Sequence, residues 1–223
     1  MALIVICLLL NHIGLRLMEL YSGLDCASGL FQLYCRLFTV NAEGMIPTMY
    51  STVALLFCSA LLMIIGISKH RLSANYILHW LGLALIFLFL AMDEALEIHE
   101  QFVGPVRSAL DITSGFFYFA WVIPYGVALF VFLAAYLKFL IELPARTRLL
   151  FGSAGCIYVT GALGFELLGG HQSALSGQDN LMYILLSTSE EVFEMGGILI
   201  FVYALLSYLG SEIKELRIGV ASE

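Results

Sequence analysis

The sequence predicts an all-α integral membrane protein, a bundle of about six transmembrane helices forming one domain over residues 1–223. Three observations lead to this prediction. Hydrophobic residues make up 61% of the chain and charged residues only 12%, whereas soluble domains carry about 25% charged residues. The apolar residues form long runs of roughly 20, the length at which a helix crosses a bilayer. The polar residues that remain are too few to cover a water-soluble globule.

Six apolar runs are the expected spans, at about 1–22, 46–68, 76–102, 113–141, 147–170 and 181–210. The first run lacks the basic segment and small-residue cleavage site of a secretory signal, so it is predicted to be retained. The region near 28–40 mixes aromatic and polar residues, which predicts a short helix lying in the membrane interface. Pro124 falls inside the fourth run, where neighbouring helices can satisfy the carbonyl that its ring leaves unpaired.

The loops predict an orientation. Basic residues follow the second, fourth and sixth runs, at Lys69, Arg71, Arg146, Arg148, Lys214 and Arg217. The positive-inside rule then places both termini in the cytoplasm, for a multi-pass protein of a bacterial inner membrane. The expected surroundings are the lipid bilayer, with a homo-oligomer or a larger membrane complex left open. The net charge is −7 and no basic patch is present, so no nucleic-acid partner is expected.

No motif assigns the chain to an enzyme class. A nucleophile elbow, a P-loop, an HExxH zinc motif and a dinucleotide fingerprint are all absent. The five cysteines are scattered, and Cys26 and Cys35 are the pair expected to share a face outside the membrane. A disulfide there and unpaired packing thiols are both open interpretations. The sequence therefore leaves open whether the protein is an enzyme.

Acidic residues and histidines gather in three of the predicted spans. The candidate site consists of Asp93, Glu94, Glu97, His99, Glu166, His171, Glu190, Glu191 and Glu194. In the predicted orientation all of them lie in the outer half of the bilayer, where each acid facing lipid would cost about 2.5–3.5 kcal/mol. We therefore expect Glu97, Glu166 and Glu194 to turn inward and cluster. One of Asp93 and Glu94, and one of Glu190 and Glu191, should join them, because adjacent helical residues diverge by about 100°.

Carboxylates with one or two imidazoles are ligands for divalent metals, so the leading hypothesis is a site for a divalent metal or another cation, opening to the outside. The Glu-x-x-His motif of di-iron bundles is absent, because Glu97 and His99 are only two residues apart. Two alternatives stay open. One is a proton- or cation-coupled transporter or channel with Glu97 and Glu194 as carriers. The other is a non-catalytic accessory subunit of a larger complex, with the acids as structural contacts between helices or with partners. Separately from these functions, Glu100 and His171 are interpreted as solvated helix ends.

Four stretches stand out together: NAEGMIPTMYS, LAMDEALEIHE, GALGFELLGG and STSEEVFEMGG. They resemble a group of uncharacterised bacterial multi-pass membrane proteins with IPT, DE…HE and EE..EM motifs, over most of residues 38–210. The resemblance implies the membrane-bundle fold and the outer acidic cluster, and no chemistry. Membrane hydrolases of the ceramidase type are similar in lining a membrane cavity with acids and histidines. Their HxxxH motif is absent here, so their activity is not expected.

Overall fold

The computed structural model describes residues 2–22, 45–71 and 75–221. In these ranges every regular element is a helix, as expected. The elements are α1 (Ala2–Ser22), α3 (Met45–Arg71), α4 (Ile77–Leu96), a 3-10 turn η1 (His99–Phe102), α5 (Val103–Ala109), α6 (Val122–Glu142), α7 (Ala145–Val159), a π-helical segment η2 (Thr160–Phe165), α8 (Glu166–Ser176) and α9 (Leu181–Ala221). The interfacial helix predicted near 28–40 and the Cys26–Cys35 pair lie outside the described residues.

Five helical stretches are long and apolar enough to cross a membrane: Ile46–Lys69, Ile77–Leu96, Val122–Glu142, Ala145–Ser176 and Leu181–Ser211. The first helix carries a shorter apolar stretch, Leu3–Leu15. The described residues are thus all-helical, as predicted, and five of their helices could span a membrane by length and composition. The sixth span stays a prediction.

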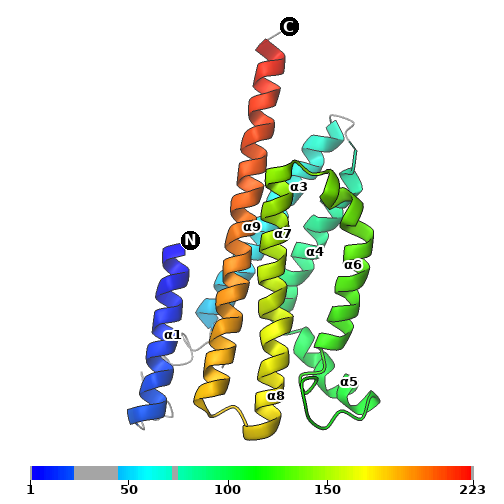
Figure 1. Ribbon diagram of the computed structural model, residues 1–223. Coiled ribbons are helices and arrows are strands. Elements are labelled where there is room, and N and C mark those ends of the chain that lie inside the picture. The colour runs from blue at the N-terminus through cyan, green and yellow to red at the C-terminus, as the bar shows by residue number, and fades with distance from the viewer. Residues whose placement is uncertain (1, 23–44, 72–74, 222–223) are drawn as a thin grey trace.

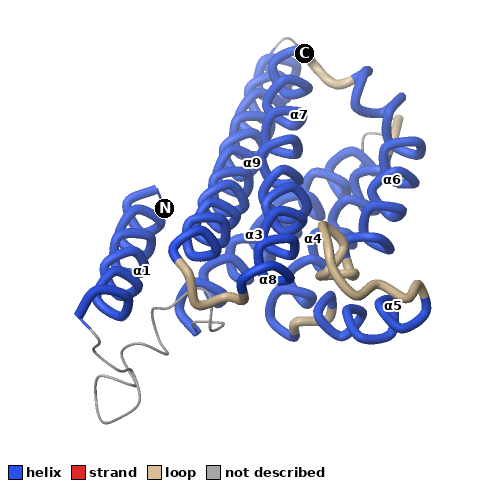
Figure 2. The backbone as a smooth tube through the Cα atoms, turned by 60° about the horizontal axis from the view of Figure 1, so that its bottom comes forward, coloured by secondary structure: helices blue, strands red, loops and turns tan. Residues whose placement is uncertain are grey.

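The helices run up and down beside one another, with α3 packed along α4 and α7 along α9 (Figure 1). Helices α4 and α8 finish at the same end of the bundle at which α6 and α9 begin, at the bottom of Figure 1 and in the foreground of Figure 2. We call this end the carboxylate end. It brings the last turn of α4, the whole of α8 and the first turns of α9 to one level, although they are far apart in sequence.

Helix α1 contacts α9. The ring of His12 is fully buried there and its Nε2 lies 3.0 Å from Oγ1 of Thr188. Because the Thr188 hydroxyl donates its one hydrogen to the carbonyl of Ile184 at 2.7 Å, its oxygen accepts from the ring. This polar contact fixes α1 against α9 inside the bundle.

The half of the bundle away from the carboxylate end is held by aromatic packing. The ring of Trp80 stacks on Tyr208 at 5.0 Å and meets Phe139 edge-on at 5.1 Å. Phe87 and Phe201 stack at 4.5 Å between α4 and α9. Such ring pairs add about 0.5–1.5 kcal/mol each beyond the area they bury. This half is therefore an apolar core, and the polar side chains gather in the other half.

Most of α6 faces outward. Its buried residues are Val122 and Phe139, while Val127, Phe130 and Val131 are 60%, 75% and 64% exposed. An exposed apolar face of this length would be a liability in water, but hydrocarbon is its natural surrounding in a bilayer. The exposure of α6 therefore agrees with its assignment as a transmembrane helix.

Two predicted spans have different bounds in the structure. Helix α4 ends at Leu96 and does not continue to residue 102, because Glu97 adopts a left-handed conformation (φ 52°, ψ 43°) and its N–H bonds the carbonyl of Asp93. Helix α6 starts at Val122 and not near 113, because residues 110–121 form turns. Within these turns Asp111 and Gly115 have φ values of 51° and 92°, which a continuous helix excludes.

The backbones of α9 and of the α7–η2 stretch approach each other closely at two glycines. A Cβ added to Gly161 would lie 2.9 Å from the carbonyl oxygen of Glu190 and from Cγ of Glu194. At Gly197 an added Cβ would lie 2.8 Å from the backbone nitrogen of Tyr158. Small residues allow such contacts between membrane helices. Gly161 belongs to the π-helical segment, a conformation that is frequent at functional sites, and here it adjoins two of the candidate acids.

Candidate functional site

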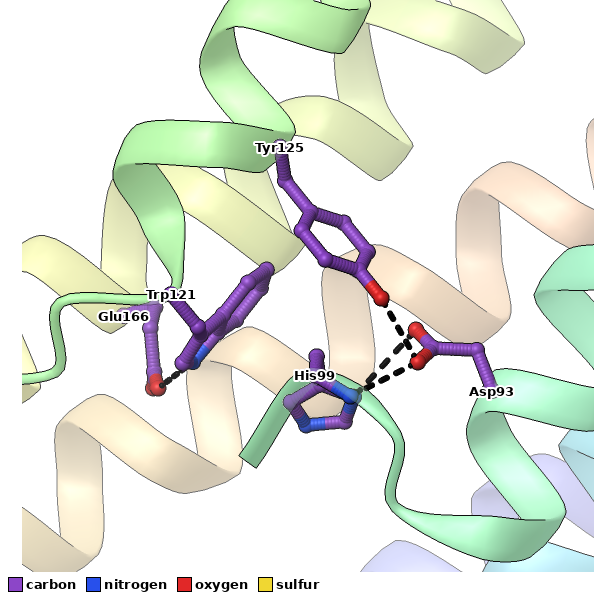
Figure 3. Close-up of polar contacts among 5 residues, drawn as sticks. All are labelled: Asp93, His99, Trp121, Tyr125 and Glu166. Atoms are coloured by element: carbon purple, nitrogen blue, oxygen red, sulfur yellow. Dashed lines mark hydrogen bonds and ion pairs between the residues drawn. The ribbon is translucent and has the colours of Figure 1, made fainter. Parts of the chain in front are cut away.

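Asp93 is the centre of the first group of polar contacts. Asp93 is a buried residue, and its carboxylate accepts three hydrogen bonds. The backbone N–H of His99 donates to Oδ1 at 2.8 Å, and ring Nδ1 of His99 donates to Oδ2 at 3.2 Å. The hydroxyl of Tyr125, on α6, donates to Oδ1 at 2.8 Å. A carboxylate with this many donors is well satisfied away from water, as Figure 3 shows.

The left-handed turn at Glu97 makes this arrangement possible. It ends α4 and reverses the chain, so that His99 returns over the last turn of the helix and meets Asp93 six residues earlier. In a continuous helix, residues six apart point to different faces and their side chains do not meet. The contact between Asp93 and His99 therefore depends on the end of the helix.

Glu166 is the centre of the second group. Its Oε1 accepts a hydrogen bond of 2.7 Å from the indole Nε1 of Trp121, which is buried just before α6. The ring of His99 packs against the Trp121 indole with centroids 4.7 Å apart. His99 lies between Asp93 and the Trp121–Glu166 pair in Figure 3, and it interacts electrostatically with Glu166. The two groups thus join at one histidine.

The carboxylates of α9 complete the cluster. Glu190 lies within hydrogen-bonding reach of Glu166 on α8, and Glu191 lies within electrostatic reach of Glu94 on α4. Glu194 lies within electrostatic reach of Glu191, Glu94 and Glu166. The expectation that only one of Glu190 and Glu191 faces inward is therefore wrong. Both lie near carboxylates of other helices, Glu190 near Glu166 on α8 and Glu191 near Glu94 on α4.

His99 lies outside the spanning stretches, and its pKa is set by opposing effects. Burial of the ring favours the neutral imidazole, while the hydrogen bond to Asp93 and the negative charges of Asp93, Glu166 and Glu100 favour the imidazolium. The charges outweigh the burial, so the pKa of His99 is raised above its usual value. Among the described residues, His99 is the basic group in direct contact with an acid of this cluster.

Two predicted site residues lie apart from the others. Glu97 occupies the left-handed turn after α4, and its carboxylate makes no hydrogen bond or ion pair within the described residues. Glu97 follows the end of α4 at Leu96, so it does not continue the helix that carries Asp93 and Glu94. His171, on α8, stacks its ring on Phe116 at 4.4 Å, and its buried Nδ1 has no hydrogen-bond partner. The central trio expected from the sequence is thus reduced to Glu166 and Glu194.

Three aromatic residues of the site were not expected from the sequence. Trp121, Tyr125 and Tyr158 were not among the candidate site residues. In the structure Trp121 bonds Glu166, Tyr125 bonds Asp93, and Tyr158 interacts electrostatically with Glu194. The sequence did contain a signal for these residues, since an indole N–H or phenol O–H inside an apolar segment needs a hydrogen-bond partner.

The acids and His99 of the candidate site form linked pairs, and they do not surround one point as the ligands of a metal ion do. In the described ranges, no group of three or more His, Cys, Asp and Glu side chains is placed so as to hold a metal ion. Binding of a divalent metal or another cation therefore stays a prediction from the sequence. What the geometry supplies is a run of groups that accept and donate protons, from His99 to Glu166 and Glu190.

Comparison with known proteins identifies a family but no activity. The model of the DUF8692 family, described as a domain of unknown function, matches residues 1–209. Because the match covers almost the whole chain, the protein belongs to this family. No curated protein and no solved structure matches the chain.

Proposed function

We propose that this member of a family of unknown function binds and releases protons inside the bilayer, as a proton-coupled transporter or channel. One observation carries the proposal, the closeness of the carboxyl groups of Glu166 and Glu190, which lie within hydrogen-bonding reach of each other. Two carboxylates repel each other and neither has a hydrogen to donate, so they bond only when one of them holds a proton. A shared proton between two membrane helices is what a proton-binding site requires.

The surroundings of the pair support this function. Glu191 and Glu194 add two more acids on α9, and Glu94 faces them from α4. Intramembrane acids are costly and mark ion pathways and proton relays in transporters and pumps. Carboxyl groups that exchange a proton with one another tolerate this environment, because a protonated acid carries no charge to desolvate.

The distribution of basic residues indicates from which side of the membrane protons reach the acids. Lys69, Arg146 and Arg148 lie at the end of the bundle opposite to the carboxylate end. By the positive-inside rule that opposite end faces the cytoplasm of a bacterial inner membrane, and both termini lie on the cytoplasmic side. Protons would then reach the carboxylates from the outside.

The test is proton flux in proteoliposomes that enclose a pH-sensitive dye. An imposed pH gradient should collapse with the wild-type protein, and Glu166→Gln or Glu190→Gln should slow the collapse at least tenfold. The matched control is Asp179→Asn, an exposed acid in the turn between α8 and α9, which should retain wild-type flux. Infrared difference spectra should show a protonated carboxyl band in the wild type that Glu190→Gln removes. Wild-type flux in both Gln variants, with an unchanged carboxyl band, would overturn the proposal.

A further inference from the structure

We infer that His99 is the residue through which protons pass between the solvent at the carboxylate end and the Glu166–Glu190 pair, with Asp93 as its positioning residue. This inference rests on the proposed function, because it names the access route to that same pair. It also assigns a role to a histidine that three elements, α4, α6 and α8, surround.

The two nitrogens of the His99 ring face different surroundings. Nδ1 is bonded to Oδ2 of Asp93 at 3.2 Å, and the other ring nitrogen points away from Asp93 (Figure 3). The side chain is 25% exposed, whereas that of Asp93 is 10% exposed. An imidazole held by one nitrogen to a carboxylate keeps its second nitrogen free for proton exchange, the arrangement that general acid–base histidines use.

The ring also lies on the route to the carboxyl pair. It packs on Trp121 at 4.7 Å, and the Trp121 indole holds Oε1 of Glu166 at 2.7 Å. The Trp121 indole thus holds Glu166 beside the ring, and the negative charge of Glu166 acts on the imidazole. His99 is thus the partly exposed group that adjoins the buried pair.

The charged and titratable groups around His99 favour this role. Asp93 and Glu94 face it from α4, Glu166 faces it from α8, and Glu100 follows it in the chain. From α6, the hydroxyl of Tyr125 donates to Asp93. With three donors on Asp93, its carboxylate accepts hydrogen bonds and holds the ring, and does not compete for the travelling proton.

The proposed step is a simple transfer. Nε2 of neutral His99 takes a proton from water while Nδ1 stays bonded to Asp93, giving an imidazolium. Nε2 then releases that proton to the Glu166 carboxylate, directly or through one water, and the ring returns to its neutral form. One proton moves from solvent to Glu166, one N–H bond forms and breaks, and no further reactant is needed.

A purely structural role for His99 makes different predictions. Its backbone N–H also bonds Asp93 and closes the end of α4, and this contact survives any side-chain substitution. His99→Gln should therefore keep the fold, slow proton uptake at least tenfold, and be accelerated by imidazole added to the outer solution. The control His79→Gln, at the opposite end of α4 and packed on Phe139, should keep the wild-type rate and ignore imidazole.

Asp93→Asn provides a second, independent variant. The neutral amide removes the negative charge that raises the pKa of His99, so the midpoint of the pH profile of uptake should move to lower pH. If His99→Gln and Asp93→Asn leave rate and profile unchanged while Glu190→Gln abolishes flux, the inference is overturned and the proposed function survives. If the wild type itself moves no protons, both fail together.

Discussion

Asp93 and His99 form a closed contact across the end of α4, in which one carboxylate receives both the backbone N–H and the ring Nδ1 of a residue six positions later. The contact does two things at once. It ends a transmembrane helix at a defined residue, and it places an imidazole beside the intramembrane acid Glu166. Helix termination and site assembly are therefore the same structural event in this protein.

The stability of the folded protein should depend on pH through His99. Its pKa is raised in the folded state, so its stabilising charge is fully present below the ordinary histidine value of 6.5 and is lost as pH rises through the folded value. The difference in free energy of unfolding between wild type and His99→Gln should thus shrink with rising pH. Unfolding in mixed micelles across this range measures it, and Asp93→Asn should weaken the effect. A difference that grows with pH would contradict the assignment.

The hydrogen bond from Trp121 to Glu166 should be measurable in a double-mutant cycle. Trp121→Phe keeps an aromatic ring but removes the N–H, and should lower the free energy of unfolding by about 1–2 kcal/mol. In the Glu166→Gln background the same change should cost less, because the charged acceptor is already gone. The coupling energy from the four unfolding curves reports the bond. Equal costs in both backgrounds would show that the indole acts by packing alone.

The sequence was sufficient to predict that the acids share one depth in the bundle. That depth follows from the order of the spans and the charge of the loops alone. Of the predicted trio, Glu166 and Glu194 come within electrostatic reach of each other, and both Asp93 and Glu94 lie near Glu194, where only one of the two was expected. Glu97 does not join them, because helical periodicity assumes a continuous helix and no residue after Asp93 signals the left-handed turn. Periodicity describes the interior of a helix, and the end of a helix is decided by contacts that form only in the fold.

The aromatic members of the site escaped prediction for a related reason. Residues 113–141 read as one apolar run, and nothing in that run singled out Trp121 as a partner for an acid. In the structure the run divides into turns and a helix that begins at Val122, and this division directs the indole toward Glu166. The pairing partner comes from a segment 45 residues away, and a sequence without its fold does not show which acid the indole will meet.

The close approach at Gly161 should be intolerant of any side chain. An added Cβ would meet backbone atoms of Glu190 and Glu194 at 2.9 and 3.0 Å, and backbone cannot move aside as a flexible side chain can. Gly161→Ala should therefore cost about 1–3 kcal/mol of stability, the usual cost of overpacking. Gly155→Ala is the matched control on α7, since nothing lies within 4 Å of its added Cβ. A thermal unfolding midpoint equal to that of the control would contradict the close contact.

The orientation of the bundle can be tested by cysteine labelling in intact cells, after the native cysteines are replaced. Asp179→Cys lies in the turn at the carboxylate end, Arg148→Cys near the start of α7 at the opposite end, and Phe130→Cys on the outward face of α6.

A membrane-impermeant maleimide should label residue 179 from outside, residue 148 only after the cells are permeabilised, and residue 130 in neither case. The reason is that basic loops stay in the cytoplasm, while a thiol surrounded by hydrocarbon is not ionised and does not react. Labelling of residue 148 but not 179 in intact cells would reverse the orientation, and with it the side from which His99 takes up protons. Ready labelling of residue 130 would instead remove α6 from the set of transmembrane helices.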